Sequence, residues 1–166
     1  MSFETMKIML AKAYDQHVKA VRSRQQAGHG RAIVGRSAAK QPGIPVLSGA
    51  TGIGKTACVT QFASQKGFEL LELDGASMPS SYLATTMFVA IQQIISKETT
   101  GCIVLIDNIN EADAEWRALL DQYAEHYFDA LVNIADAAAP GGIEKERQQI
   151  SHLPENLFVI GEQRPD

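Results

Sequence analysis

The chain has 166 residues, of which 45% are hydrophobic and 20% charged, and its formal net charge is −4. This is the composition of a globular domain large enough to bury one core, and the acidic balance gives no reason to expect nucleic acid or an anionic membrane as a partner. Because no apolar run approaches the ~20 residues that span a bilayer, and the N-terminus lacks the apolar core of a secretory signal, we expect a cytoplasmic protein that uses no membrane.

The N-terminal segment has the periodicity of an amphipathic helix. Apolar side chains recur at steps of three and four residues over 3–21, and charged side chains stand between them. Gly28 is a plausible stop. We therefore divide the chain into an N-terminal helix (1–27), a loop rich in glycine (28–43) and a core (44–166).

Residues 49–56 match the phosphate-binding loop pattern G-x-x-x-x-G-K-[ST], between a short apolar run and the start of a helix. Glycines let successive backbone N–H groups turn toward an anion, where the helix dipole is positive. The pattern directs Lys55 to the β- and γ-phosphates and the Thr56 hydroxyl to Mg²⁺. The residues expected to contact a nucleoside triphosphate are Gly49, Ala50, Thr51, Gly52, Ile53, Gly54, Lys55, Thr56 and Ala57.

The remaining chain alternates between strands and helices. We expect strands at 44–48, 68–73, 102–107 and 157–161, and helices at 57–66, 81–97 and 111–133. Ser80 or Ser81 is expected to cap the second of these helices. The alternation predicts an α/β fold, a three-layer αβα sandwich with a parallel sheet, with nucleotide at the carboxyl ends of the strands.

The strand predicted at 102–107 ends in an aspartate. Its uninterrupted apolar run suits a parallel strand buried on both faces. In P-loop folds a carboxylate at the tip of a neighbouring strand holds Mg²⁺ beside the phosphates. We therefore expect Thr56 and Asp107 to form the metal site.

Together these stretches resemble the AAA+ ATPases, most closely their MoxR and dynein-related branch. Residues 46–56 resemble the Walker A strand and loop of that family, 103–112 its Walker B motif, and 153–166 the strand that carries sensor 1. The segment 78–81 is similar to a Pro-Ser segment of the same branch. The resemblance implies ATP with Mg²⁺, ATP/ADP exchange, a homo-oligomer such as a ring or hexamer, and a protein partner that is remodelled.

Two positions depart from the family pattern. Asn108 stands where the family has its catalytic glutamate, and an amide orients water but cannot accept its proton. Gln163 stands in for the sensor 1 asparagine, and Glu111 is a candidate for a displaced carboxylate. The expected catalytic set is therefore Lys55, Asp107, Asn108 and Gln163, with slow hydrolysis that Asn108→Glu should accelerate.

The family resemblance also implies parts that the sequence does not show. A fifth strand, an arginine finger and a helical lid follow sensor 1 in that family, so we interpret 44–166 as a core without the lid. Arg147 and Arg164 are the nearest candidates for a finger, although neither occupies the expected place. Two alternatives stay open: a nucleotide-binding switch with little or no hydrolysis, and a small-molecule P-loop kinase.

Overall fold

The computed structural model describes residues 2–26, 44–50, 52–126 and 155–164. Along these segments the elements are α1 (Phe3–Gln26), β1 (Val46–Ser48), α2 (Lys55–Lys66), β2 (Glu69–Asp74), α3 (Ser81–Ile95), β3 (Cys102–Asp107), the 3₁₀ turn η1 (Ile109–Glu111), α4 (Ala114–His126) and β4 (Leu157–Gln163). The loop predicted at 28–43, the last turns of the helix predicted to reach residue 133, and Arg147 lie outside these segments.

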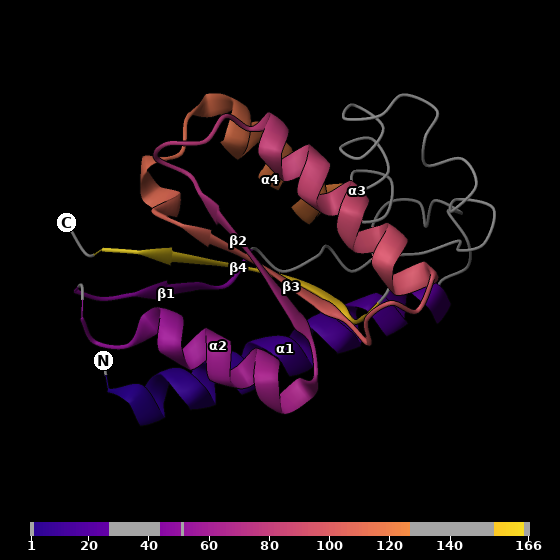
Figure 1. The fold of residues 1–166 in the computed structure, drawn as a ribbon, viewed down its shortest axis with the longest axis horizontal. Helices are drawn as coiled ribbons and strands as arrows, with labels where there is room; N and C mark the ends of the chain where they lie inside the picture. The colour runs from indigo at the N-terminus through magenta and orange to yellow at the C-terminus, as the bar shows by residue number, and fades with distance from the viewer. Residues whose placement is uncertain (1, 27–43, 51, 127–154, 165–166) are drawn as a thin grey trace.

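Within the described segments, four strands form one parallel sheet in the order β1-β4-β3-β2. The strand that leads into the P-loop is therefore at one edge. The last strand in the chain, β4, lies between it and β3 (Figure 1). This order brings the end of β4 next to both the P-loop and Asp107, because all four carboxyl ends point the same way.

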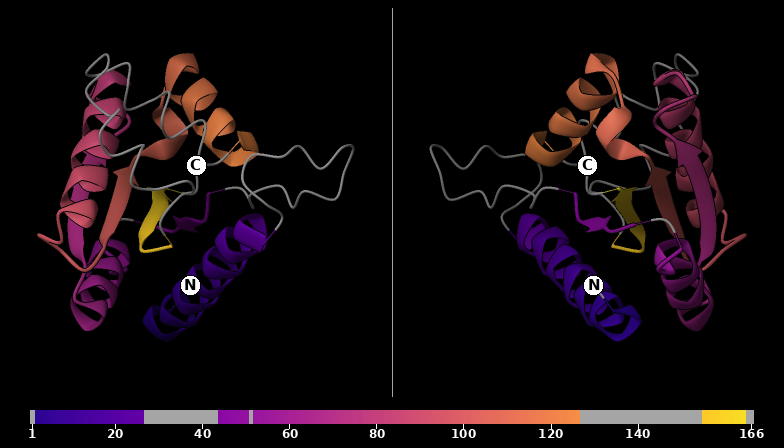
Figure 2. Two further views of the ribbon diagram at one scale, coloured as in Figure 1. Left: turned by 90° about the vertical axis from the view of Figure 1, so that its right-hand side faces the viewer. Right: turned by 90° about the vertical axis from the view of Figure 1, so that its left-hand side faces the viewer.

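Helices cover both faces of the sheet, with α1 and α2 on one side and α3 and α4 on the other (Figures 1 and 2). The pleat of β3 divides its side chains between two buried clusters. Ile103 and Leu105 pack with α1 and α2, and Val104 and Ile106 pack with α3 and α4. The predicted three-layer α/β sandwich is confirmed.

The N-terminal helix α1 belongs to the same core. Met6 and Leu10 are buried in the cluster that also contains Leu47 of β1. At its other end Arg22 forms two hydrogen bonds to the Glu155 carboxylate, at 2.8 and 3.0 Å. The helix α1 is thus held to the sheet layer at both of its ends. No described helix is both long and apolar enough to cross a membrane.

On the opposite face the indole of Trp116 is the largest fully buried side chain. Its Nε1 donates to the Met78 carbonyl at 2.8 Å, which joins α4 to the segment before α3. Asp113 caps α4 by accepting from the Trp116 N–H at 3.1 Å. Ser80 occupies the N-cap position of α3, one of the two positions predicted, but its hydroxyl makes no capping hydrogen bond and donates instead to Glu115 at 3.1 Å.

Element boundaries differ from the predictions by up to three residues: the helix predicted from residue 111 begins at Ala114, after the turn η1, and the helix predicted to end at residue 97 ends at Ile95. Helix α2 begins at Lys55 instead of residue 57, because the loop closes directly into the first helical turn. Strand β4 continues two residues beyond Gly161, since Glu162 and Gln163 pair with Leu47 and Ser48 of β1. This extension carries two polar side chains to the carboxyl edge of the sheet.

Candidate functional site

The P-loop owes its shape to glycines in the left-handed region. Gly52 has φ of 91° and Gly54 has φ of 93°, which side chains with a Cβ rarely adopt. A Cβ on Gly49 would collide with Cδ1 of Ile53, so that side chain would have to move to accept one. The Gly49 N–H donates to the Gln163 carbonyl at 3.1 Å, which attaches the loop to the end of β4.

Lys55 stands at the first position of α2 and is only 9% exposed. Its Nζ donates to the carbonyl of Gly49, and to that of Ala50 at 3.4 Å. The ammonium therefore lies under the loop, within reach of an anion that the loop N–H groups would bind. Thr51, also expected to contact nucleotide, lies outside the described residues.

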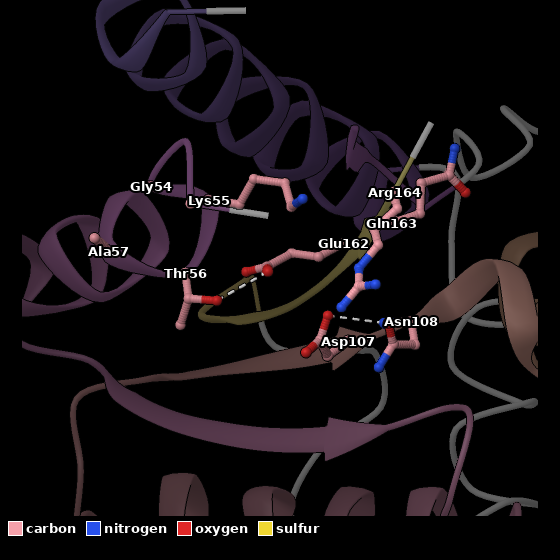
Figure 3. A pocket seen from close by; sticks show the side chains of 10 residues that line it. Gly54, Lys55, Thr56, Ala57, Asp107, Asn108, Glu162, Gln163 and Arg164 are labelled. Atoms are coloured by element: carbon pink, nitrogen blue, oxygen red, sulfur yellow. Dashed lines mark hydrogen bonds between the residues drawn. The ribbon is translucent and has the colours of Figure 1, made fainter. Parts of the chain in front are cut away.

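A cleft of about 300 Å³ opens between the P-loop and the carboxyl ends of β3 and β4 (Figure 3). Its walls are Gly52, Gly54, Lys55, Thr56, Ala57, Asp107, Asn108, Glu162, Gln163 and Arg164. The four residues expected to be catalytic thus share one cavity with five of the expected nucleotide contacts. Gly49, Ala50 and Ile53 do not line it, and Ile53 packs against the buried cluster below the loop.

Asp107 ends β3 with an exposed carboxylate on the rim of the cleft. Its Oδ1 accepts the Asn108 N–H at 2.9 Å, which fixes the direction of the carboxylate (Figure 3). The other oxygen is left for a ligand. The carboxylate thus lies at the tip of β3 beside the P-loop, and its role as a magnesium ligand stays a prediction.

Glu162 is the residue that sequence reasoning missed. Its side chain is only 2% exposed and its Oε1 accepts a hydrogen bond from the Thr56 hydroxyl at 2.9 Å (Figure 3). Burial raises the pKa of the Glu162 carboxyl, as does the charge of Asp107, while the Thr56 hydrogen bond and the charge of Lys55 act in the opposite direction. A carboxylate thus lies between the two predicted metal ligands.

A sequence signal for Glu162 did exist. Phe158 and Ile160 of β4 pack on the side of α1 and α2, and the period of two puts Glu162 on that same face. That face leads directly to the P-loop helix. Because the strand is predicted to end at Gly161, its alternation of side chains is not extended to Glu162.

Asn108 lines the cleft, but its side-chain amide is bonded elsewhere. The residue has φ of 52°, and Nδ2 donates to Oδ1 of Asp74 at 3.0 Å. This hydrogen bond is the main reason that the pKa of Asp74 is lowered, followed by the bonds from the Ala76 N–H and the Ser77 hydroxyl. The amide therefore joins the tips of β2 and β3.

The two residues after Glu162 take different directions. Figure 3 shows the amide of Gln163 turned away from the Glu162 carboxylate, as alternation along a strand requires, and the guanidinium of Arg164 extending into the cleft. Glu111 lies in the turn η1 with an exposed side chain and is not among the described residues that line the cleft. Arg164 therefore lies in the cleft of its own chain.

Comparison with protein families gives a match over residues 45–160 to the model for AAA, the ATPase family associated with various cellular activities. The chain belongs to the AAA family. No curated protein matches the sequence. The matched region of the AAA domain includes the P-loop and Asp107, and it ends two residues before Glu162.

A divalent cation fits the residues of this AAA domain. Thr56, Asp107 and Glu162 present only oxygen atoms, the ligands that Mg²⁺ prefers. Oε2 of Glu162 is a buried side-chain polar atom for which the described part of the structure records no hydrogen bond. A buried carboxylate oxygen with no donor is an atom that a cation would satisfy.

Proposed function

We propose that the protein is an ATP-binding AAA ATPase that works as a homo-oligomer and couples the binding and hydrolysis of ATP to the remodelling of a protein partner. The observation that carries this proposal is the shared cleft, in which Lys55 and Thr56 of the P-loop face Asp107. The family match supports nucleotide binding. The MoxR and dynein-related branch is our finer assignment and rests on the motifs alone.

In this proposal the chain's own residues do the binding and positioning. Loop N–H groups and Lys55 hold the phosphates, and Thr56 and Asp107 hold Mg²⁺, which when bound neutralises phosphate charge. Arg164 adds a second cationic side chain at the open side of the cleft. Water is excluded on the inner side, where Lys55 and Glu162 are buried.

Hydrolysis is proposed to be slow. The side chain at position 108 is an amide, and its donor is bonded to Asp74 and not to the cleft. An amide accepts no proton from water. The rate acceleration of about 10²- to 10⁴-fold that a general base contributes is therefore lost from this position. The same observation favours the second candidate, a switch or assembly module that holds nucleotide with little turnover.

The test is a calorimetric titration of the protein with ATP and Mg²⁺, repeated with Lys55→Ala and with Lys19→Ala as the matched control. Lys19 is exposed on α1 and pairs with Asp15, at 3.2 Å. Binding should be lost in Lys55→Ala and kept in Lys19→Ala. A wild type without affinity for ATP would contradict the proposal and the switch alternative alike.

Turnover separates the two candidates. ATPase activity measured against protein concentration, with particle mass in the same samples, should rise with assembly if hydrolysis is shared between subunits. Binding with no turnover at any concentration would support the switch. Phosphoryl transfer to a small acceptor, independent of concentration, would indicate a kinase.

A further inference from the structure

We propose that Glu162 is a ligand of the divalent cation that accompanies the nucleotide, so that the metal site contains two carboxylates, Asp107 and Glu162, together with the Thr56 hydroxyl. This inference rests on the proposed nucleotide binding. It assigns a role to a residue that lies outside the matched family region. Four observations lead to it.

The first is the register of the sheet. Ile106 pairs with Gly161 in the parallel ladder of β3 and β4, so the next position on each strand is Asp107 and Glu162. Both continue the face that packs against α1 and α2. Neighbouring strands lie about 4.8 Å apart, which lets two carboxylates reach one cation.

The second observation is the burial of Glu162. The residue is 2% exposed, and Oε2 has no hydrogen-bond partner in the structure. Burying a carboxylate with half of its acceptors unused is unfavourable, and placing it next to Asp107 adds repulsion between like charges. A cation between the two oxygens removes both costs.

The third observation is the direction of the Thr56 hydroxyl. Its proton is donated to Oε1 of Glu162, at 2.9 Å between the oxygens. The lone pairs of the Thr56 oxygen then face away from that bond and are available to a cation. Glu162 therefore orients one expected ligand while presenting its second oxygen, Oε2, as another.

The fourth observation is the chemistry of the set. A hydroxyl and two carboxylates are hard oxygen donors, and a nucleotide phosphate with waters completes the octahedron that Mg²⁺ requires. Asn108 supplies no carboxylate, and its Nδ2 is directed to Asp74, to which it donates a hydrogen bond. The second carboxylate of this site thus comes from β4.

The experiment measures the metal directly, by the loss of the free Mn²⁺ electron paramagnetic resonance signal on titration into protein saturated with ADP. We compare the wild type with Glu162→Gln, and use Glu98→Gln as the control for charge, since Glu98 is exposed in the turn before β3. In the Glu162→Gln complex the Kd for Mn²⁺ should rise at least about 10-fold, the lower end of the loss seen when even an outer-shell partner of a metal ligand is removed. In Glu98→Gln it should not change.

A second readout concerns the nucleotide alone. In EDTA, ADP should bind Glu162→Gln at least as tightly as the wild type, because the variant removes a negative charge beside the phosphates. If Glu162→Gln does not fold, Glu162→Asp is measured instead. The shorter carboxylate should weaken the binding of Mn²⁺ and leave the binding of ADP in EDTA unchanged.

The outcomes are distinct. A Kd for Mn²⁺ that stays within about threefold of the wild type in the substituted protein, below the roughly 10-fold minimum expected even for an outer-shell partner, would overturn this inference while leaving the proposed function intact. A wild type that binds no ADP, with or without metal, would overturn both. Loss of Mn²⁺ affinity confined to the Glu162 variants would support it.

Discussion

The side chain of Asn108 donates a hydrogen bond to the carboxylate of Asp74, with 3.0 Å between Nδ2 and Oδ1. The two residues stand at the ends of neighbouring strands, where Asp74 pairs in register with Asp107. Asn108 has φ of 52°, a conformation that asparagine tolerates better than most residues. The amide of Asn108 therefore joins the ends of β2 and β3, in addition to lying beside the cleft.

This pair changes the prediction for Asn108→Glu. A glutamate there would face the Asp74 carboxylate and would hold an unfavourable backbone conformation, so we expect a loss of about 1–2 kcal/mol in the free energy of unfolding. The single variant should lower Tm, and the gain in ATPase rate expected from sequence alone should be small.

The exchange variant Asp74→Asn with Asn108→Glu should behave differently. It restores one amide and one carboxylate to the pair, so Tm should recover relative to Asn108→Glu. With a carboxylate now at position 108, steady-state ATPase activity should exceed that of the wild type. If the double variant were as unstable as Asn108→Glu, the contact between positions 74 and 108 would not be the cause of the lower stability.

Gly54→Ala should impair both stability and nucleotide affinity. The new Cβ would require φ near 93° and would lie 3.3 Å from Cδ2 of Phe3. We expect a loss of roughly 1–2 kcal/mol, or about 2–8 °C in Tm for a chain of this size. Gly67→Ala is the matched control, because Gly67 also has positive φ (72°) but caps the far end of α2.

The comparison separates strain from function. Both alanine variants should lower Tm, whereas only Gly54→Ala should raise the Kd for ATP in a titration. If Gly67→Ala weakened ATP binding equally, the effect of Gly54→Ala would be one of general stability.

His17 makes the stability of the fold depend on pH. It is 3% exposed, and burial lowers its pKa from 6.5 to about 4, against the opposing effects of backbone groups of Glu155 and Leu157 and of the Glu155 charge. Since the unfolded chain then takes up the proton first, stability is lost as pH falls from about 6.5 toward 4, by about 3 kcal/mol in all.

The measurement is urea unfolding of the wild type and His17→Gln at several pH values. The wild type should lose stability below pH 6.5, and the difference between the two proteins should shrink as pH falls. A difference that stays constant with pH would mean that His17 titrates normally in the folded state. The carboxylates common to both proteins cancel in this comparison.

Arg164→Ala should weaken ATP binding by roughly 10- to 100-fold, the range expected when a charged hydrogen-bond donor to phosphate is removed. The guanidinium lines the cleft of its own chain and is exposed, so its removal should leave Tm nearly unchanged. Binding of AMP should change less than binding of ATP. Arg117→Ala, on the exposed surface of α4, is the control and should bind ATP normally.

Much of the fold follows from local patterns in the sequence. The apolar run of β3 predicts a strand buried on both faces, and its residues 102–106 are all buried. The G-x-x-x-x-G-K-[ST] pattern predicts a loop whose backbone needs glycine, and Gly52 and Gly54 both have positive φ. These predictions succeed because each depends on residues adjacent in the chain.

The site is only partly predictable, because its decisive contacts join distant positions. Thr56 and Glu162 are 106 positions apart, and Asn108 and Asp74 are 34 apart. Both contacts depend on which strands are neighbours, and the strand order β1-β4-β3-β2 is not encoded in the periodicity of any one segment. The period of two along β4 indicates the face on which Glu162 lies, but its contact with Thr56, like that of Asn108 with Asp74, follows only from the strand order.

Trp116 is the single tryptophan of the chain, and it lies fully buried with its Nε1 bonded to the Met78 carbonyl. Its fluorescence therefore reports on the layer of α3 and α4 without any added label. Unfolding exposes the indole to water, and the emission shifts to longer wavelength. Every stability measurement described above can thus be followed by an intrinsic optical signal from a residue that does not line the cleft.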